Sequence, residues 1–428
     1  MLQTIVNAFK IKEVRRKILI TIALLFVYRI GCWIPVPGIE GFNFENAEFM
    51  SIMDAINGGA LTNATFFAMG IGPYINASII IQLLTVGIPA LERLSKQGEE
   101  GKRKINTYTR ILTLFLAIAQ AVGILLAFGG ENISSITLFG FSGKFAKVMT
   151  YIFLVIIYTA GAALTMWIGE RITDYGVSNG ISLLIFAGIL STLGRAVLSM
   201  ILALFGGNFL VNFWKLLGFV GAALIIFAAI VCVNSAERKI PVQYAKQVKG
   251  RKMYGGQSTH IPIKVNSSGV MPLIFAFAIL SLPDLIMSLA GVKDGNWWQT
   301  NLGAGTVPYF IILCVLILFF SYFYNQIQFN PDDISKSIQS NGGFIPGTRP
   351  GKPTGDYLRR VANRITLFGA IYLAIIALIP SLIFSAIDQT LVTAFSATGL
   401  LIVVSVALEF DQALQSQIMM KNYKGFLK

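Results

Sequence analysis

The chain has 428 residues, of which 55% are hydrophobic and 13% are charged, and its formal net charge is +14. Soluble globular proteins carry about 25% charged residues, so this composition excludes a soluble enzyme and predicts a helical protein that crosses a membrane many times. The only histidine, His260, has no second His or Cys near it in sequence, so no metal or other cofactor is predicted. The three cysteines lie singly in apolar runs and are predicted to be packing residues.

The N-terminal segment, residues 1–17, is predicted to be an amphipathic helix on the membrane surface, because its apolar residues share one helical face and a basic run follows them. A first span is expected over about 18–36, ended by Pro35 and Pro37. No small-residue cleavage site closes this run, which favours a retained span over a removed signal peptide. Arg29 lies inside the span and is interpreted as a snorkelling or helix-packing cation, with no functional role assigned.

The stretch from Asn57 to Pro89 organises the chain. Its second part, from Gly70, is apolar and uncharged and is long enough to cross a bilayer core of about 30 Å. Its first part, residues 57–69, is short, contains Gly and Asn, and is separated from the second by Gly70, Gly72 and Pro73. Irregular backbone at membrane depth is tolerated only inside protein or beside a water-filled cavity. The pattern therefore predicts a re-entrant piece next to a cavity; a surface loop leading into an ordinary helix is the alternative from this stretch alone.

Ten apolar runs predict an all-α membrane protein with ten transmembrane helices. They are 18–36, 70–89, 111–128, 148–168, 181–203, 211–233, 269–290, 308–325, 365–386 and 391–409. The runs divide into an N-terminal half, 18–203, and a C-terminal half, 211–410, followed by a tail over 411–428. Five spans in each half would permit an inverted repeat, although the halves show no clear sequence similarity.

Lys and Arg predict the orientation of the chain. Of the 34, 28 fall in the segments that lie on the same side as the N-terminus, and six fall on the other side or in the spans. Cytoplasmic segments carry the excess of Lys and Arg, so both termini are predicted to be cytoplasmic.

Two cytoplasmic loops, 235–267 and 327–364, are too long for simple connectors. The first alternates β-branched and polar residues on each side of Gly255–Gly256, which predicts a hairpin with its turn there. The second is rich in Pro and Gly around Arg349. Basic loops can contact anionic lipid, nucleic acid or a large protein. The turn and strand signals favour docking of a large partner over lipid contact alone.

Four long strings of the sequence resemble the SecY family, the central subunits of the bacterial protein-conducting channel. They are GPYINASIIIQLL (72–84), GERITDYGVSNGIS (169–182), GGQSTHIPIKVNSSGVMP (255–272) and GGFIPGTRPGKPT (342–354). The similarity runs over essentially the whole chain. One departure is AKQVKGRK (245–252), which is one basic residue shorter than the family's usual run.

The resemblance implies a channel in two halves that is closed by a plug, opens sideways to lipid and has no enzymatic activity. The implied constriction is a ring of six isoleucines: Ile75, Ile79, Ile181, Ile185, Ile274 and Ile402. Its first two pairs are spaced i, i+4, so both members of each pair face the same way on a helix. A ring of branched apolar side chains wets poorly and blocks ions without a charged filter. Packing or lipid contact is the alternative for any single isoleucine in an apolar span.

The resemblance also assigns the other candidate sites. The plug corresponds to about 57–69, with Asn57, Gly58, Gly59, Ala60, Leu61, Thr62, Asn63, Phe66 and Phe67 as its residues. Asn76 and Gln120 are candidates for the lateral gate, with an interhelical hydrogen bond as the alternative role. Candidate docking residues are Arg238, Lys239, Lys246, Lys249, Arg251, Lys252, Arg349 and Lys352.

The implied location is the plasma membrane of a bacterium. The implied partners are the small membrane subunits SecE and SecG, the motor ATPase SecA, the ribosome, signal sequences and nascent or unfolded polypeptides, and the lipid bilayer. The sequence disfavours two other functional classes. A small-solute transporter would usually need carboxylates or His near the bilayer midplane, whereas Glu170, Asp174, Asp284 and Glu409 fall near span ends. An intramembrane protease would need a Ser–His pair or paired Asp within spans, and no such pair is evident.

Overall fold

The computed structural model describes most of the chain. The described residues are 2–39, 41–42, 54, 56–128, 144–205, 209–244, 247–249, 252–254, 258–266, 269–289, 306–387 and 397–425. They form two compact units. The first comprises Met1–Phe219, Ala278–Ala304 and Phe384–Lys428, and the second comprises Val220–Phe277 and Gly305–Ile383.

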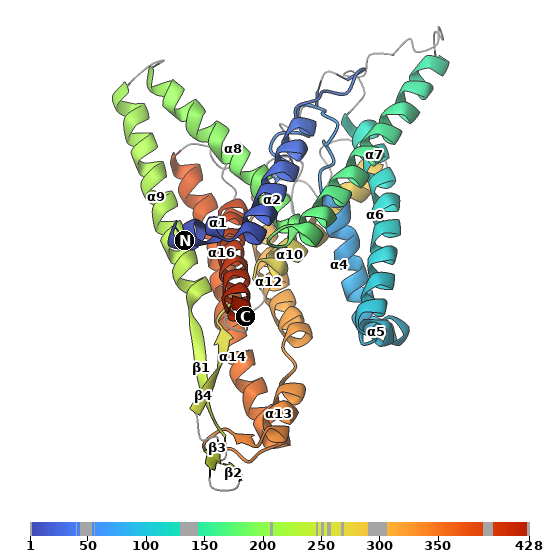
Figure 1. The fold of residues 1–428 in the computed structure, drawn as a ribbon. Helices are drawn as coiled ribbons and strands as arrows, with labels where there is room; N and C mark the ends of the chain where they lie inside the picture. The colour runs from blue at the N-terminus through green and yellow to red at the C-terminus, as the bar shows by residue number, and fades with distance from the viewer. Residues whose placement is uncertain are drawn as a thin grey trace. The chain divides into compact units, whose positions relative to one another are not determined.

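Helices make up the first unit (Figure 1). They are α1 (Leu2–Lys10), α2 (Lys12–Gly31), α4 (Gly72–Gly87), α5 (Pro89–Ser95), α6 (Glu99–Phe128), α7 (Lys144–Tyr175), α8 (Gly180–Phe205) and α16 (Ala397–Gly425). Three further helices, α9 (Phe209–Ser235), α10 (Met271–Leu289) and α14 (Lys352–Ile387), run from one unit into the other. The second unit adds α12 (Val307–Gln328) and α13 (Pro331–Ser340).

A helix occupies each of the ten predicted spans. Within the described residues, seven helices are long and apolar enough to cross a membrane, and the α4–α5 pair makes an eighth if it is one broken span. That pair is bent by 106°. The bend follows from Pro89, which opens α5 and holds the preceding Ile88 in an extended conformation. The chain is therefore a multi-pass membrane protein, and the count of ten spans and the two five-helix halves stay predictions.

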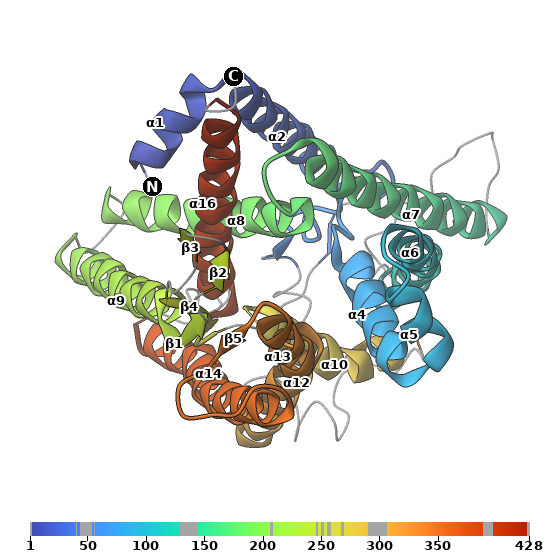
Figure 2. The same cartoon turned by 60° about the horizontal axis from the view of Figure 1, so that its bottom comes forward.

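The first unit is a layer of neighbouring helices. α4 packs on α6, α6 on α7, and α7 on α8, while α2 contacts both α7 and α8 (Figure 2). The N-terminal helix α1 packs against α2 and α16. Ala8 of α1 is fully buried in a cluster with Val14, Ile18, Val177 and Leu414. This amphipathic helix is thus held against the C-terminal helix, and its Val6 and Phe9 remain exposed.

The two long loops fold together in the second unit. Strand β1 (Glu237–Tyr244) pairs antiparallel with β4 (Ser258–Lys264), so that Ile240 lies opposite Ile261. On its other edge β1 pairs with β5 (Gly343–Phe344), which belongs to the second loop. Six buried side chains join the strands to α13 and the start of α14: Ile240, Val242, Ile263, Ile338, Ile345 and Leu358. The loops are therefore parts of one body, which we call the loop body.

The hairpin predicted in the first loop is confirmed, but its predicted turn is wrong. Strands β2 (Gln247–Lys249) and β3 (Lys252–Tyr254) pair with Lys249 opposite Lys252, so the chain reverses between these two residues. The prediction had put the reversal at Gly255–Gly256, which lies outside the described residues.

Candidate functional site

The predicted plug, residues 57–69, is a compact run of turns just before α4. We call it the plug segment. The carboxylate of Asp54 organises its start: Oδ1 accepts hydrogen bonds from the N–H groups of Leu61 (2.8 Å) and Thr62 (2.9 Å), and Oδ2 accepts one from the Thr62 hydroxyl (2.6 Å). The N–H of Gly59 donates to the Asp54 carbonyl at 2.8 Å. A single acid thus satisfies several backbone groups that a turn leaves without partners.

The two ends of the plug segment are tied to each other. Asn57 is 2% exposed, and its Nδ2 donates to the Ala68 carbonyl at 3.1 Å. Gly70 follows with φ +52°, and a methyl group on it would overlap the Asn57 side chain. This position therefore requires glycine for both its backbone angle and the close approach of Asn57.

The chain leaving α2 forms the edge against which the plug segment lies. Phe66 donates its N–H to Ile34 O (2.9 Å), and Val36 donates its N–H to Ala64 O (3.1 Å). The Phe42 N–H donates to Thr62 O at 2.9 Å. These bonds give the plug segment sheet-like pairing without a named strand, and they supply partners for backbone that is otherwise irregular.

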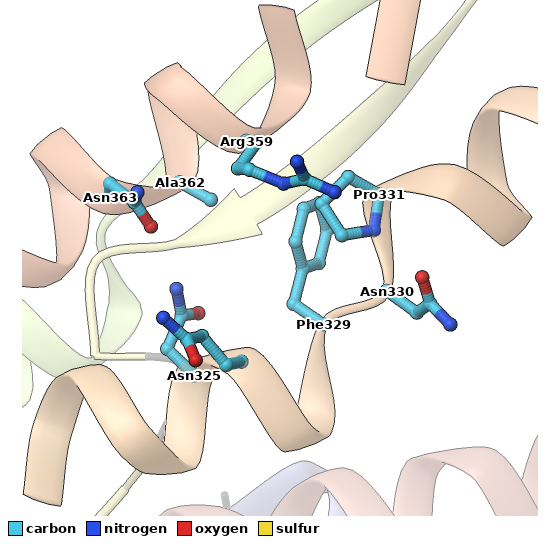
Figure 3. A pocket seen from close by; sticks show the side chains of 8 residues that line it. Asn325, Phe329, Asn330, Pro331, Arg359, Ala362 and Asn363 are labelled. Atoms are coloured by element: carbon cyan, nitrogen blue, oxygen red, sulfur yellow. The ribbon is translucent and has the colours of Figure 1, made fainter. Parts of the chain in front are cut away.

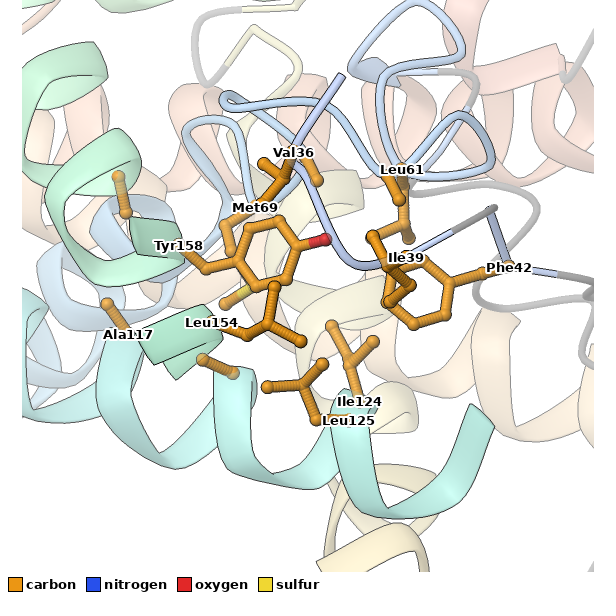
Figure 4. Packing of buried hydrophobic residues seen from close by; sticks show 14 residues of the cluster. Val36, Ile39, Phe42, Leu61, Met69, Ala117, Ile124, Leu125, Leu154 and Tyr158 are labelled. Atoms are coloured by element: carbon orange, nitrogen blue, oxygen red, sulfur yellow. The ribbon is translucent and has the colours of Figure 1, made fainter. Parts of the chain in front are cut away.

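Apolar side chains seat the plug segment on α6 and α7 (Figure 4). Leu61, Ala64, Ala68 and Met69 of the segment, together with Val36, Ile39 and Phe42, contact the buried residues Ala117, Ala121, Ile124, Leu125, Leu154, Tyr158 and Ala162. On the α2 side, the Phe67 ring stacks on Tyr28 with 5.7 Å between ring centroids. The segment therefore rests on a continuous apolar surface within the first unit.

Three glycines, one on each of three helices, let the backbone of these helices approach the plug segment. A methyl group on Gly31 of α2 would overlap the Phe67 ring, and one on Gly161 of α7 would overlap the Phe66 carbonyl. On α8, a methyl group on Gly188 would overlap the Ile56 carbonyl. Sequence reasoning missed these three residues, because a glycine in an apolar helix does not by itself identify what it touches.

Two arginines lie at the Gly58–Gly59 turn of the plug segment. Arg195 of α8 donates from Nη2 to the Gly58 carbonyl. Arg29 of α2 donates from Nη2 to Ala187 O (2.6 Å) and Gly188 O (3.2 Å) of α8. From the sequence, Arg29 is interpreted as a packing or snorkelling cation without a functional role, and Arg195 is not among the predicted site residues. The sequence does contain a signal for both arginines, because a cation inside or beside an apolar span usually has a functional or structural partner.

Five of the six isoleucines of the predicted ring belong to the first unit. Ile75 and Ile79 lie on α4, Ile181 and Ile185 on α8, and Ile402 on α16. Ile79, Ile185 and Ile402 are 4–5% exposed, and Ile75 and Ile181 are half-buried. Ile274, also half-buried, lies on α10 in the second unit. Both i, i+4 pairs fall within regular helices, so each pair shares a face; the closed ring itself stays a prediction.

The two lateral-gate candidates lie on neighbouring helices. Asn76 is half-buried on α4, next to Ile75, and Gln120 is 9% exposed on α6, which packs on α4. Their role as a gate stays a prediction.

The docking candidates belong to the loop body as far as it is described. Arg238 and Lys239 are exposed on β1, Arg349 is exposed between β5 and α14, and Lys352 is exposed at the start of α14. The Arg349 carbonyl accepts a hydrogen bond from the Thr354 hydroxyl at 2.8 Å, which fixes the backbone of this loop. Lys246 and Arg251 lie outside the described residues, and Lys249 and Lys252 are described only as backbone of β2 and β3.

A polar cavity of about 440 Å³ lies in the second unit where α12, α13 and α14 meet (Figure 3). It is lined by Asn325, Gln326, Phe329, Asn330, Pro331, Arg359, Ala362 and Asn363. The Arg359 guanidinium pairs with the Asp332 carboxylate at 2.8 Å. None of the residues predicted from the sequence lines this cavity.

Comparison with known proteins identifies the family. The SecY family profile matches residues 65–410. The chain belongs to the SecY family. Protein translocase subunit SecY of Streptomyces galbus is 42% identical over 446 residues, covering 100% of both chains.

Solved structures of SecY-type channels share the fold. One is of a SecY channel whose plug domain is described as stabilising the closed state and maintaining a membrane seal; it has a TM-score of 0.63 and 19% identity and covers 94% of this chain and 92% of its own. Another is Sec61 in a canine ribosome–channel complex from the endoplasmic reticulum, with a TM-score of 0.63, 18% identity and the same coverages. The arrangement of helices is thus that of a SecY-type channel.

We predict that Gly161→Ala unseats the plug segment, because the new methyl group overlaps the Phe66 carbonyl, which cannot move away as a flexible side chain could. Overpacking costs about 1–3 kcal/mol, so a buried reporter cysteine at Ala68 should react with maleimide about tenfold faster. The background lacks Cys32, Cys232 and Cys314. Gly194→Ala is the matched control, because nothing lies within 4 Å of a methyl group there. Equal labelling rates in both variants would show that α7 does not hold the plug segment.

Proposed function

We propose a mechanism by which this channel closes and opens. By family and fold the chain is a protein-translocating channel. An aliphatic constriction and the plug segment seal the path at rest. The channel passes unfolded secretory polypeptides across the membrane and releases apolar segments sideways into lipid. We assign it no catalytic activity of its own.

One observation carries the proposal: an irregular, buried segment leads directly into a helix with a paired aliphatic face. The backbone of the plug segment is satisfied by Asp54 and by the chain leaving α2. Backbone of this kind is tolerated at membrane depth where protein surrounds it or where it borders a cavity. It ends at α4, which carries Ile75 and Ile79. A plug beside a narrow apolar constriction, which we call the neck, is the simplest function that explains the plug segment and α4 together.

The chemistry of the constriction suits a channel for polypeptides of any sequence. A ring formed by Ile75, Ile79, Ile181, Ile185, Ile274 and Ile402 would resist wetting and would therefore block ions. Branched aliphatic side chains offer no hydrogen-bonding groups, so they can part around a passing chain without selecting its sequence. Asn76 and Gln120 would contribute polar groups where the channel opens sideways.

The loop body is the proposed docking surface for the partners that drive transport. It presents Arg238, Lys239 and Arg349 on a folded core, which holds these cations in fixed positions. SecA and the ribosome are the proposed partners at this surface, and SecE and SecG are the proposed membrane partners. The sequence contains no GxxxxGK[ST] motif, so energy is proposed to come from these partners. The proposed location is a bacterial plasma membrane with both termini in the cytoplasm, in keeping with the distribution of Lys and Arg.

Site-specific crosslinking tests the proposal most directly. A photocrosslinker at Ile79, in complex with a secretory chain arrested during transport, should form adducts with that chain because the proposed neck surrounds it. A crosslinker at Ile156, 61% exposed on α7, is the control and should label lipid only. Adducts of position 79 with lipid alone would rule out Ile79 as part of the path.

Replacing Ile79 or Ile402 by Asn should loosen closure, because a polar group lets water enter the neck. We expect the resting ion conductance of the purified complex in planar bilayers to rise about tenfold or more, as for a shift of at least 1.4 kcal/mol in the closed state. Ile79→Leu keeps the neck aliphatic and should leave the conductance near that of the parent. An unchanged leak in both Asn variants would contradict the ring.

Arg349→Glu should impair SecA- or ribosome-dependent transport while the channel still folds, because the side chain is exposed. Reversing the charge turns an attractive contact into a repulsive one, and we expect transport in vitro to fall about tenfold or more. Lys336→Glu, an exposed cation of α13 in the same body, is the control. Rising salt should weaken docking of the parent as well. Transport by Arg349→Glu at the parent rate would remove Arg349 from the docking surface.

A further inference from the structure

Two guanidinium groups, from different helices, meet the same turn of the plug segment. Arg195 of α8 donates from Nη2 to the carbonyl of Gly58. Arg29 of α2 lies against Gly58 from the other helix, because a methyl group on that glycine would overlap the Arg29 guanidinium. Its Nη2 is held by the carbonyls of Ala187 and Gly188 on α8. Arg29 therefore bridges α2 and α8 at the place where the plug segment begins.

The Gly58–Gly59 pair fits this contact in two ways. Both residues have positive φ, +72° and +82°, a conformation that glycine adopts at little cost. In addition, a methyl group on Gly59 would overlap the Arg195 guanidinium, as one on Gly58 would overlap that of Arg29. The turn thus exposes bare backbone to the two cations, which brings the Gly58 carbonyl within reach of Arg195.

The hydrogen bonds that both arginines make in the described structure go to backbone carbonyls, and the Arg29 guanidinium also lies 5.9 Å from the centroid of the Tyr28 ring. The ion pairs found among the described residues involve neither Arg29 nor Arg195. Nη1 of Arg29 is buried and has no hydrogen-bond partner there. Asp54, the acid just before the plug segment, accepts hydrogen bonds from Leu61 and Thr62. A charged donor on a neutral carbonyl makes a strong bond that still breaks without separating an ion pair.

We propose that Arg195, with Arg29 behind it, latches the plug segment in the closed channel by its Gly58–Gly59 turn. The inference rests on the proposed function, since it concerns the piece that seals the path. The apolar seat on α6 and α7 gives the plug segment its position, and the latch sets how often it leaves. Opening of the channel breaks the bond from Arg195 to Gly58.

Resting conductance tests the latch. Arg195→Gln removes the charge and shortens the donor, so the purified complex in planar bilayers, without substrate, should conduct about tenfold more than the parent, the factor expected when a charge-assisted hydrogen bond is lost. Transport of a secretory precursor should persist and shows that the variant is folded. Lys147→Gln, at an exposed cation of α7, is the control and should not leak.

A second variant tests the same contact from the side of the plug segment. Gly59→Ala forces a methyl group into the Arg195 guanidinium and should also leak. Because both changes break the same contact, the double variant should leak no more than the stronger single one, whereas independent effects would multiply. Gly98→Ala tests positive φ by itself, since Gly98 has φ +73° and nothing within 4 Å of a methyl group, and it should not leak.

Deletion of residues 57–69 separates failure of the latch from failure of the proposed function. If the deletion leaks while Arg195→Gln and Gly59→Ala do not, the plug seals the channel but the latch is wrong. If the two variants leak independently and their effects multiply, the latch is also wrong. If the deletion itself does not leak, the sealing role of the plug segment fails, and the latch fails with it.

Discussion

The structure of the first unit depends on the need of irregular backbone for hydrogen-bond partners where water is scarce. A helix satisfies its own backbone, but the run of turns before α4 does not. Here the partners are the Asp54 carboxylate, the Asn57 amide and the edge of the chain that leaves α2. With those bonds made, the segment can bury Leu61, Phe67 and Met69 against three helices instead of unfolding into the membrane.

The helices on which the plug segment rests approach its backbone closely. Gly31, Gly161 and Gly188 let helical backbone come close, which adds dense contact to the packing of apolar side chains. This close approach positions the segment, whose side chains Leu61, Phe67 and Met69 are buried against the helices. Under the proposed function the segment has both to seal the path and to leave it, and its bonds to carbonyls are the contacts that break without separating an ion pair.

In the second unit, the loop body is built around a small core of its own. Residues from two loops about a hundred positions apart build one small core, with β1 shared between β4 and β5. A folded core fixes the backbone that carries exposed cations such as Arg238 and Arg349. The polar cavity beside α13 belongs to this body and adds amide groups and Arg359 to its surface. In the proposed function, recognition of large partners therefore falls to a folded body and not to the plug segment.

The sequence by itself determined the class of protein, the apolar spans in which the long helices lie and the hairpin of the first loop, because hydropathy and strand alternation are local properties. It also marked residues 57–69 as unusual through their glycines and the break at Pro73. It did not indicate the short helices α5 and α13. The tertiary structure alone decided what those residues touch: Arg195 meets Gly58 from 137 positions away, and β1 pairs with β5 across the chain. A charge in an apolar run indicates that the side chain has a partner, but the packing of the helices determines which group that partner is. That choice depends on contacts between distant residues, which no local pattern records.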